Sequence, residues 1–447
     1  MHTTQAGTKT LIVGLGKTGL SCARFLTAHG VEIAVTDSRA QPPGLQELHN
    51  EMPDTAVFVG GFSEAALQHA DQLVVSPGIA VSTPFILKAK HMGLPVLGDI
   101  ELFARHARAP VVAITGSNGK STVTTLVGLM AEQAGRDVRV GGNLGTPALD
   151  LIKENEPDLY VLELSSFQLE VTESLRCLSA AVLNVSPDHM DRYASLEEYS
   201  AAKARIYRHC AVAVLNRDDA HVRDMDTGAA RRVSFGIGAP QAGDYGLVTR
   251  DTRRWLMHGE TRIVAADELH LAGDHNLANA LAAIALGDAA GLPMEAMLTA
   301  LKQFRGLPHR MEFITRAHGV DWYDDSKGTN VGATVAAVSG MSGPLVLIAG
   351  GDGKGQDFAP LADALIGKTR IVILLGKDAA AIETAIAGRI PVQRVKDMPG
   401  AVRAAAKVAQ SGDRVLLSPA CSSLDMFENF EHRGRVFADA ARRLADG

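Results

Sequence analysis

The sequence predicts an α/β fold in which helices cover parallel sheets. Short β-branched runs alternate with Ala/Leu-rich stretches along almost the whole chain, which is the pattern of parallel strands joined by helices. The chain has 447 residues, and at roughly 150 residues per domain this length predicts three domains. With 46% hydrophobic and 21% charged residues, its composition is that of ordinary globular domains.

The strand-like runs fall into three blocks, and we expect domains at residues 1–98, 99–307 and 308–447. A helix over residues 276–290 ends the second block. Residues 225–270 carry turn residues and weak alternation, which predicts a small antiparallel segment. The expected strands are residues 10–13, 32–35 and 72–75 in the first block, 111–114, 160–164, 180–185 and 212–215 in the second, and 345–349, 371–375 and 414–417 in the third.

Charge and cysteine content exclude several classes of protein. The net charge is −6 without a basic run, so we expect neither nucleic acid nor an anionic membrane as partner. The chain starts without the features of a signal peptide, and it contains no apolar stretch of roughly 18 residues. The scattered cysteines form no CxxC pair, which fits a reducing compartment. We therefore expect a cytoplasmic protein. The cysteines are Cys22, Cys177, Cys210 and Cys421.

A glycine-containing loop, T-G-S-N-G-K-S-T at residues 115–122, lies between a strand-like run and a helix over residues 121–134. A helix N-terminus offers free N–H groups and a positive dipole end, which favour phosphate. In such loops the lysine, here Lys120, reaches the β- and γ-phosphates, and the hydroxyl, here Ser121, ligates Mg²⁺. The glycine spacing is shorter than usual, so an ordinary turn with a surface lysine is the alternative. The predicted ATP-binding residues of the loop are Gly116, Ser117, Asn118, Gly119, Lys120, Ser121 and Thr122.

A second glycine turn, G-L-G-K-T-G at residues 14–19, follows the first expected strand, and Asp37 ends the second one. This spacing is that of a dinucleotide-binding turn with an acidic residue on a ribose. The pattern alone predicts a tight turn and a pocket for phosphate or sugar. It does not establish NAD as the ligand.

Two polar residues in the second block, Glu163 and His189, carry the strongest chemical signals. Glu163 interrupts an apolar run, and a buried carboxylate is costly unless it is paired or holds a cation such as Mg²⁺. His189, in S-P-D-H-M-D, follows the strand at 180–185, where open α/β sheets bind ligands. A satisfied carboxylate and a structural histidine are the alternatives. Lys203 on its own is interpreted as a solvated lysine.

Further polar segments lie at the start of a helix and after strands. Asn276 and Asn279 share a helix face, so their amides could reach an adenine or a phosphate, or cap the helix. In the third block, polar or glycine-rich segments at residues 324–330, 350–355 and 418–423 follow strands. These segments are expected to share one edge of the sheet, which would be a binding face.

The motifs occur in one order along nearly the whole chain. They are T-G-S-N-G-K-S-T, Glu163 with S-S-F-Q-L, S-P-D-H-M-D-R, A-A-K-A-R-I-Y, G-D-H-N-L-A-N-A, L-P-H-R-M-E, D-D-S-K-G-T-N, A-G-G-D-G-K-G and S-P-A-C-S-S-L-D-M-F-E-N-F. This ordered set resembles the Mur ligase family, and within it the members that add glutamate to a muramoyl-alanine nucleotide.

The resemblance implies three domains with separate tasks. These are a Rossmann-like N-terminal domain for the UDP part of the substrate, a central P-loop-type ATPase domain, and a Rossmann-like C-terminal domain for the incoming amino acid. ATP would phosphorylate the carboxylate of UDP-N-acetylmuramoyl-L-alanine to an acyl phosphate. The amine of D-glutamate would then attack, and phosphate would leave a tetrahedral intermediate. The implied cofactors are ATP and two Mg²⁺ ions, and the enzyme is expected to act as a monomer in cytoplasmic peptidoglycan precursor synthesis.

The resemblance also assigns the catalytic residues Lys120, Glu163, His189 and Lys203. Ser121 and Glu163 would hold one Mg²⁺, and His189 and Lys203 the second. In the family this lysine is carbamylated, which turns a cation into a carboxylate.

The remaining implied contacts are carried over residue by residue. Lys17 departs from the small or apolar residue expected at its position. The contacts are Asn276, Arg310 and Asp325 for ATP; Asn143, Ser165 and His189 for the muramoyl part; Thr18, Asp37, Ser38, Arg39, Ser76 and Gly78 for the uridine diphosphate; and Lys327, Thr329, Lys354, Ser423 and Phe430 for glutamate.

Three alternatives explain less of the chain. A ligase like folylpolyglutamate synthase shares the phosphate loop and the lysine but lacks a nucleotide-binding domain like residues 1–98. An NAD-dependent oxidoreductase leaves the phosphate loop unexplained. A P-loop regulator without ligase chemistry would need neither Lys203 nor His189.

Overall fold

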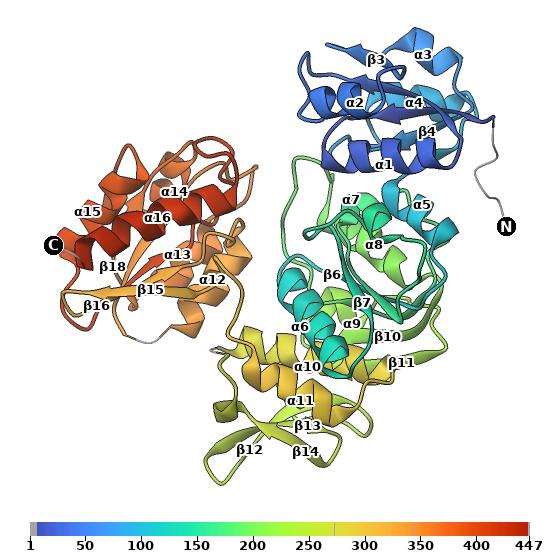
Figure 1. Cartoon of the computed structure of the whole chain (residues 1–447). Helices are drawn as coiled ribbons and strands as arrows, with labels where there is room; N and C mark the ends of the chain where they lie inside the picture. Colours follow the sequence, from blue (N-terminus) through green and yellow to red (C-terminus); the bar gives the residue numbers. More distant parts are fainter. Residues whose placement is uncertain (1–6, 272, 342, 446–447) are drawn as a thin grey trace.

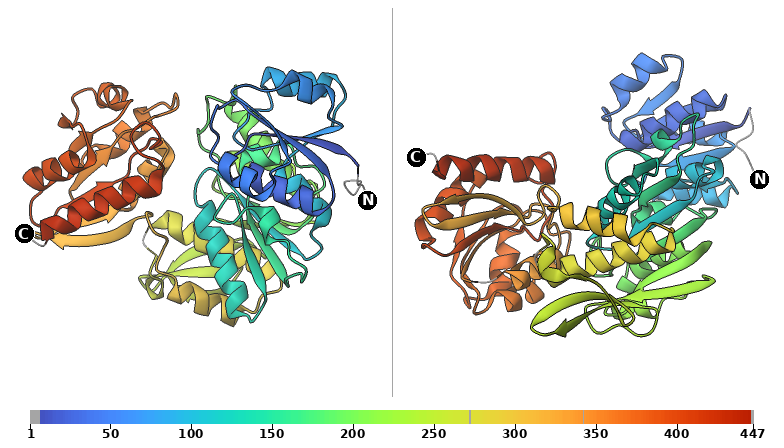
Figure 2. Two further views of the ribbon diagram at one scale, coloured as in Figure 1. Left: turned by 45° about the horizontal axis from the view of Figure 1, so that its top comes forward. Right: turned by 60° about the horizontal axis from the view of Figure 1, so that its bottom comes forward.

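The computed structural model describes residues 7–271, 273–341 and 343–445, and these contain three sheets in chain order. The N-terminal sheet (blue) lies above the middle sheet, and the C-terminal sheet (orange and red) lies to one side (Figure 1). Two turned views show that the C-terminal part joins the rest through the yellow part of the chain, away from the N-terminal part (Figure 2). The molecule is therefore an angled arrangement of three α/β parts around the middle one.

The N-terminal sheet is parallel throughout, in the order β3-β2-β1-β4-β5. Because β1 lies between β2 and β4, the segments that follow these strands share one edge of the sheet. The elements are β1 Lys9–Val13, α1 Lys17–Ala28, β2 Glu32–Asp37, α2 Leu45–Glu51, β3 Ala56–Val59, α3 Glu64–Gln68, β4 Gln72–Val75, α4 Pro84–His91 and β5 Val96–Leu97. The strands at 10–13, 32–35 and 72–75 were predicted from their apolar runs, and the structure confirms them.

The middle sheet has the order β14-β13-β12-β11-β10-β9-β6-β8-β7. It is parallel from β7 to β12 and antiparallel from β12 to β14, so the antiparallel prediction is confirmed only for the last three strands. The elements are α5 Asp99–His106, β6 Val111–Thr115, α6 Lys120–Gln133, β7 Val138–Gly142, β8 Leu159–Glu163, α7 Ser166–Leu169, β9 Cys177–Val182, α8 Leu196–Ala204, β10 Cys210–Asn216, α9 Ala220–Arg223, β11 Arg231–Phe235, β12 Tyr245–Arg250, β13 Arg253–His258, β14 Thr261–Ala265, α10 Asp274–Ala289 and α11 Met294–Gln303.

Alternate residues of the middle strands pack into two cores, one on each face of the sheet. Val112 and Val161 pack with residues of α6, α10 and α11. Ala113 and Leu162 pack with residues of α5, α7 and α8, and this core continues into α1 of the N-terminal part. The β6 strand, buried on both faces, therefore carries the phosphate loop from a fixed position.

The predicted strand at residues 180–185 is wrong at its end, because β9 stops at Val182. The chain turns there to meet the phosphate loop. The backbone N–H of Ser117 donates to the carbonyl of Asn184 at 2.9 Å, and that of Asn118 donates to the Asn184 side chain at 2.8 Å. The end of this apolar run is therefore not part of the strand, and the polar groups of Asn184 bind the phosphate loop.

The C-terminal sheet has the order β15-β16-β20-β17-β18-β19. The neighbours β16, β20 and β17 place the segments at 324–330, 418–423 and 350–355 along one edge, as predicted. The antiparallel hairpin of β15 and β16 was not predicted, because β15 is a partly exposed edge strand without an apolar run. The elements are β15 Glu312–Ala317, β16 Val320–Asp324, α12 Val331–Gly340, β17 Leu345–Ala349, α13 Ala359–Leu365, β18 Thr369–Leu374, α14 Ala379–Ile386, β19 Val392–Arg394, α15 Met398–Val408, β20 Arg414–Leu417 and α16 Phe430–Ala445.

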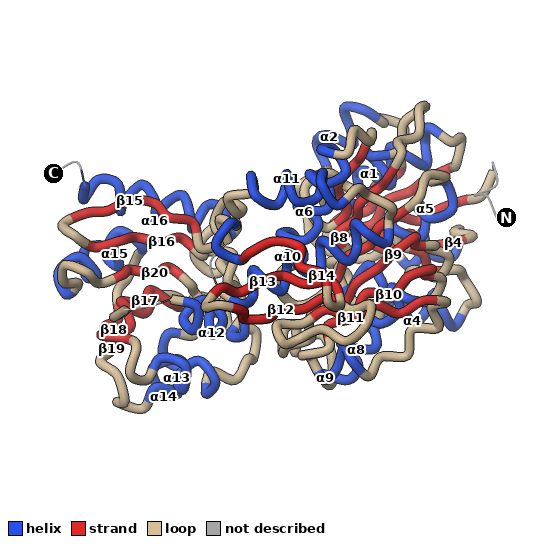
Figure 3. Tube along the Cα trace, turned by 90° about the horizontal axis from the view of Figure 1, so that it is seen from below, coloured by secondary structure: helices blue, strands red, loops and turns tan. Residues whose placement is uncertain are grey.

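The view from below shows the strands of the middle sheet side by side, with β12–β14 at the end nearer the C-terminal sheet (Figure 3). Over the residues that the structure describes, no helix is both long enough and apolar enough to cross a bilayer.

Candidate active site

The candidate site lies where three neighbouring strands of the middle sheet, β8, β6 and β9, end. Because β6 lies between β8 and β9, the phosphate loop after β6 lies between Glu163, at the end of β8, and the segment that carries His189. Together they line a cavity of about 270 Å³. Its lining residues are Ser117, Asn118, Lys120, Ser121, Asn143, Glu163, Ser165, Ser166, Phe167, Asp188, His189, Tyr199, Lys203, Arg310, Lys327, Thr329 and Asn330.

The phosphate loop needs glycine at both of its ends. Gly116 has φ 151° and Gly119 has φ 82°, and these are backbone conformations that favour glycine. A Cβ on Gly119 would also lie 2.4 Å from the side-chain oxygen of Asn279. Asn279, predicted as a ligand contact or a cap, thus packs against the loop backbone. The short spacing between Gly116 and Gly119 thus corresponds to a tight turn, against which Asn279 packs.

Lys120 folds back over the loop. Its Nζ donates to the carbonyls of Gly116 at 2.8 Å and Ser117 at 2.9 Å. Burial lowers the pKa of Lys120, and the nearby carboxylates of Glu163 and Asp188 oppose this change. The loop therefore has a cation at its centre, in position to meet a phosphate.

Glu163 meets the requirements for a metal ligand. The side chain is buried, and its Oε1 accepts from Asn143 Nδ2 at 2.7 Å. Its Oε2 is also buried and has no hydrogen-bond partner among the residues that the structure describes. An unpaired buried carboxylate oxygen is costly, and carboxylate oxygens are ligands that Mg²⁺ takes. Ser121 Oγ, which accepts from Arg310 Nη2 at 3.1 Å, belongs to the same cavity.

Lys203 is not the solvated lysine that its helix alone suggested; that interpretation was wrong. It is 1% exposed, donates to the Gly116 carbonyl at 2.9 Å, and lies 4.3 Å from the centre of the Tyr199 ring. Burial, followed by the charge of Lys120, holds the pKa of Lys203 well below its ordinary value. A buried amine of lowered pKa is a better nucleophile than a solvated one.

His189 enters the same cavity from the segment after β9. Its φ is 58°, its Nε2 lies 3.7 Å from Asp188 Oδ2, and its ring packs on Phe167. Burial lowers the pKa of His189 to about 4 against the opposing charge of Asp188. The imidazole is therefore neutral near pH 7, which is the form that ligates metal ions.

A second cavity, of about 290 Å³, lies on the other side of the phosphate loop. It contains the predicted ATP contacts Asn276, Arg310 and Asp325. It shares Asn118, Arg310 and Lys327 with the first cavity. Sequence reasoning missed other lining residues. His275 lies within the motif G-D-H-N-L-A-N-A but was given no role, and no motif marks His270, Leu271, Phe304 and Arg305.

The linker between the middle and C-terminal parts delivers Arg310. The flanking His309 and Met311 have φ of 61° and 49°. His309 Nδ1 donates to Asp324 Oδ2 at 2.6 Å, a contact that raises the pKa of His309. The N–H of Met311 donates to Asp325 at 3.3 Å. These contacts fix an unusual backbone that directs the guanidinium to the phosphate loop.

The predicted glutamate contacts divide into two groups. Lys327 and Thr329 line the first cavity, and Lys327 Nζ lies 3.7 Å from the centre of the Phe430 ring. Burial, followed by the charge of Arg310, lowers the pKa of Lys327 to about 8. Lys354 and Ser423 lie on the same sheet edge but line neither cavity among the residues that the structure describes.

The predicted uridine-diphosphate contacts lie at the edge of the N-terminal sheet, outside both cavities. Asp37 accepts from the N–H of Leu15 at 2.7 Å and from Arg39 Nη2 at 2.7 Å. Burial alone would raise the pKa of Asp37, but the hydrogen bonds from Arg39 and Leu15 lower it to about 2. Ser76 Oγ donates to the Gly14 carbonyl at 2.8 Å. The residues placed along this edge are Thr18, Asp37, Ser38, Arg39, Ser76 and Gly78.

Known proteins match the chain along its length. Family models match at residues 8–98 (Mur ligase MurD-like, N-terminal domain), 114–287 (Mur ligase middle domain) and 309–421 (Mur ligase, glutamate ligase domain). A UDP-N-acetylmuramoylalanine–D-glutamate ligase of Nitrosococcus oceani is 55% identical over 98% of each chain. The protein of the same name from Marinobacter nauticus is 52% identical over 98% of each chain. The chain belongs to the Mur ligase family.

Solved Mur ligases share the fold at low sequence identity. A UDP-N-acetylmuramate–alanine ligase, MurC, of Thermotoga maritima matches with TM-score 0.61 and 18% identity, covering 97% of this chain and 99% of the other. A pseudomurein peptide ligase type C of Methanothermus fervidus matches with TM-score 0.57 and 18% identity, covering 92% and 96%. As a Mur ligase the chain is an ATP-dependent enzyme. It is therefore neither an NAD-dependent oxidoreductase nor a regulator without ligase chemistry.

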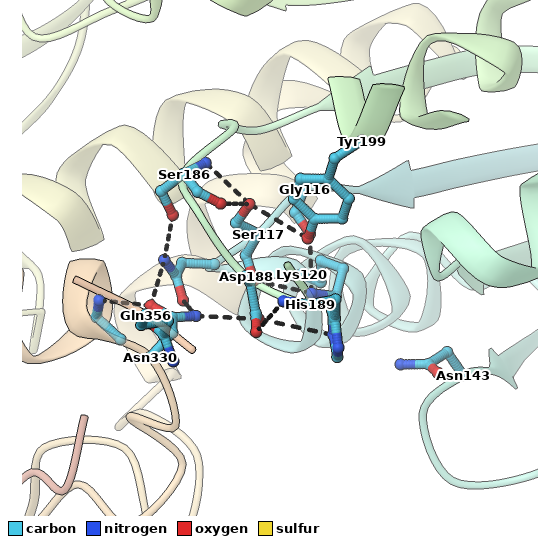
Figure 4. A network of polar contacts seen from close by, with 12 residues as sticks. Gly116, Ser117, Lys120, Asn143, Ser186, Asp188, His189, Tyr199, Asn330 and Gln356 are labelled. Carbon is cyan, nitrogen blue, oxygen red and sulfur yellow. Dashed lines mark hydrogen bonds and ion pairs between the residues drawn. The ribbon is translucent and has the colours of Figure 1, made fainter. Parts of the chain in front are cut away.

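Several residues of this Mur ligase site were absent from the sequence predictions. Asn184 supports the phosphate loop but was assigned to a strand. Asn330 and Asp188 join the loop to the segment of His189 (Figure 4). Both lie within motifs quoted for the family resemblance, so position in a motif was the available signal.

Proposed function

We propose that this Mur ligase joins D-glutamate to the alanine carboxylate of UDP-N-acetylmuramoyl-L-alanine, with ATP converted to ADP and phosphate. The observation that supports it most is the position of the phosphate loop between two cavities, with Lys120, Lys203 and the unpaired oxygen of Glu163 lining the first one. Relatives that carry this activity in their names are 50–55% identical over nearly the whole chain.

The proposed reaction has two steps. The alanine carboxylate attacks the γ-phosphorus of ATP, the bond to the β-phosphate oxygen breaks, and an acyl phosphate forms. The glutamate amine then attacks the acyl carbon, phosphate leaves, and the amine loses a proton. Lys120 would leave the loop carbonyls to neutralise the transferring phosphoryl group, since a cation there stabilises the transition state. Arg310 would meet the same phosphates from the nucleoside side.

The donor set fits Mg²⁺. Ser121 and Glu163 would hold one ion, and His189 with Lys203 would hold a second. Bound Mg²⁺ supplies the positive charge that lets a carboxylate approach a polyphosphate. We propose that Lys203 is carbamylated, because its lowered pKa makes the neutral amine available to attack CO₂; the amine loses one proton and becomes a carbamate whose oxygens can ligate a metal ion.

The three parts would divide the substrates among them. We propose domains at residues 1–98, 99–307 and 308–447, for the UDP group, ATP and glutamate respectively. Asn143, Ser165 and His189 would contact the muramoyl part, and Lys327, Thr329, Lys354, Ser423 and Phe430 would place glutamate. The proposed enzyme is a monomer in the cytoplasm, where it serves peptidoglycan precursor synthesis.

The proposal is tested by incubating the protein with ATP, Mg²⁺, UDP-N-acetylmuramoyl-L-alanine and each glutamate enantiomer. Mass spectrometry should find the muramoyl-alanyl-glutamate nucleotide with D-glutamate, and phosphate release should require both substrates. ATP turnover without either substrate would contradict the proposal. A product formed from a folate and glutamate, and not from the muramoyl nucleotide, would favour the folylpolyglutamate synthase alternative.

A further inference from the structure

A pair of asparagine side chains joins the phosphate loop to the C-terminal part. Asn330 Nδ2 donates to Asn118 Oδ1 at 3.1 Å, and Asn118 Nδ2 donates back to Asn330 Oδ1 at 3.3 Å. Figure 4 shows Asn330 approaching the loop from the C-terminal part. Two amides that exchange both hydrogen bonds fit together in one relative orientation. The pair therefore fixes how the two segments meet.

Asn330 has further partners. Its Nδ2 donates to Asp188 Oδ2 at 3.3 Å, and its Oδ1 accepts from the N–H of Ala333 at 2.9 Å. The side chain is 2% exposed. Its nitrogen thus faces two acceptors, and its oxygen faces two donors. A residue of the same shape with the opposite polarity would break these contacts.

On the C-terminal side, the contact continues toward the proposed glutamate residues. Asn330 follows Thr329 in the chain, and it caps α12. The next N–H, of Val331, donates to Gln356 Oε1 at 2.9 Å, and Gln356 Nε2 donates to the Gly353 carbonyl at 2.9 Å. Lys354 is the neighbouring residue. A path of hydrogen bonds thus runs from the phosphate loop to both loops that carry glutamate contacts.

The packing around the pair is close. Gly332, in the first turn of α12, approaches Ser186, and a Cβ on this glycine would lie 3.1 Å from Ser186 Oγ. Ser186 Oγ itself accepts from Asn118 Nδ2 at 3.4 Å. The start of α12 therefore lies directly against the segment that supports the phosphate loop.

We propose that Asn330 is a positioning residue that sets the glutamate loops at a fixed place relative to the phosphate loop. Attack by the amine requires the reacting atoms to approach within roughly 3–3.5 Å, and a misplacement of about 1 Å lowers the rate roughly 100-fold. The amide pair supplies that alignment across two separately folded parts. The inference rests on the proposed assignment of Lys327 and Thr329 to glutamate.

The Asn330→Asp variant tests the proposal. It keeps the shape and the acceptor that caps α12, but its second oxygen faces Asn118 Oδ1 and the carboxylate of Asp188. We expect kcat/KM for glutamate to fall roughly 10- to 100-fold, while KM for the muramoyl nucleotide stays within about twofold because the N-terminal contacts are unchanged. Glutamate kinetics like those of the native enzyme would overturn the proposal.

A matched control separates positioning from helix capping. Asp397 caps α15 through the N–H of Gly400, at an exposed place away from both cavities. Asp397→Asn makes the reverse exchange at a cap and should leave all kinetic constants unchanged. If Asn330→Asp lowers Tm without changing kcat/KM for glutamate, its role is only structural and the proposal fails.

Two further measurements make the outcome decisive. In a double-mutant cycle of Asn118→Ala and Asn330→Ala, the double variant should lose little more activity than the worse single variant, whereas additive losses would contradict a shared contact. Lys327→Ala tests the glutamate assignment itself. If it leaves KM for glutamate unchanged, that assignment fails; if it raises KM while Asn330→Asp is silent, only the positioning proposal fails.

Discussion

Two glycine turns of this molecule follow a buried strand and precede a helix, but their surroundings differ. In the N-terminal turn, a Cβ on Gly19 would lie 2.0 Å from the Gly14 carbonyl, and the N–H of Leu15 is bound by Asp37. In the phosphate loop, Gly119 adopts a left-handed conformation and Lys120 covers the turn. The first turn is closed by its own backbone and by Asp37, whereas the second has the Lys120 side chain beside a cavity.

The charges beside the two turns also differ. Asp37 places a carboxylate beside the N-terminal turn, and this carboxylate is paired with Arg39, whose Nη2 lies 2.7 Å from Asp37 Oδ2. The nearby Lys17 points to the middle part, where its Nζ donates to the Gly145 carbonyl at 2.6 Å. The phosphate loop instead has the side chains of Lys120 and Arg310 beside it. Glycine spacing thus marks a tight turn, and the charge beside the helix start indicates its ligand.

Removing the cation of the phosphate loop should have the largest effect. Lys120→Ala should lower kcat roughly 1000-fold or more, because the transferring phosphoryl group loses its counter-charge. Phosphate release in the presence of both substrates measures it. Circular dichroism should show an unchanged fold. A kcat near the native value would contradict the assignment of Lys120 to the transferring phosphoryl group.

The buried lysine of α8 should be replaceable by a small anion. Lys203→Ala should lower kcat roughly 100-fold, with partial recovery in acetate, since acetate can occupy the place of a carbamate as a metal-site carboxylate. Lys120→Ala is the matched control and should not respond to acetate. If a folded Lys203→Ala enzyme shows no recovery, the carbamate assignment is contradicted.

Binding of glutamate and binding of the muramoyl nucleotide should respond differently to pH. The pKa of Lys327 is about 8, and a lysine is charged below its pKa, so its ammonium is lost as the pH rises through 8. If it binds a glutamate carboxylate, kcat/KM for glutamate should fall about tenfold per pH unit above 8. KM for the muramoyl nucleotide should not follow, because the pKa of Asp37 is about 2 and its carboxylate stays charged.

Lys327→Arg is the control for this profile, since arginine remains charged throughout. The decline above pH 8 should disappear in this variant. A decline that persists would assign the titration to another group.

Changing the N-terminal turn should affect one substrate only. Asp37→Asn removes the charge that holds Arg39 and weakens the contact to Leu15. We expect KM for the muramoyl nucleotide to rise about tenfold, the result of losing roughly 1.4 kcal/mol of binding. KM for ATP should stay within about twofold. A changed KM for ATP would show that the two turns are not independent.

Removing Lys17 should have the smallest effect. Lys17→Ala breaks the exposed contact to Gly145, which contributes about 0.5–1.5 kcal/mol. Tm should therefore fall by only a few degrees, as calorimetry can measure, and kcat should be unchanged. A large rise in KM for the muramoyl nucleotide would instead place Lys17 in the nucleotide pocket.

The sequence predicted the sheets better than the contacts between them. Buried strands such as β6 and β17 are continuous apolar runs, so their positions follow from local pattern. The edge strand β15 has no such run, and β9 was extended over Asn184 because the neighbouring residues are apolar. Strand order decides which segments meet, and no local pattern shows that β6 lies between β8 and β9.

Site residues were predicted where a motif marks them. Lys120 and Glu163 were found from local chemistry alone, as a loop lysine and as a carboxylate in an apolar run. Lys203 required the family resemblance, because its burial comes from the packing of α8 against the phosphate loop, which the sequence of the helix does not show. Asn330 was missed, since a helix cap and an interdomain contact look the same in sequence.

The backbone of the linker around Arg310 has an energetic cost. The left-handed backbones of His309 and Met311 each cost about 1–2 kcal/mol, and the contacts to Asp324 and Asp325 hold them in place. The folded enzyme therefore carries an unfavourable backbone energy at these two residues. The contacts to Asp324 and Asp325 offset this cost and keep Arg310 within 3.1 Å of Ser121 Oγ.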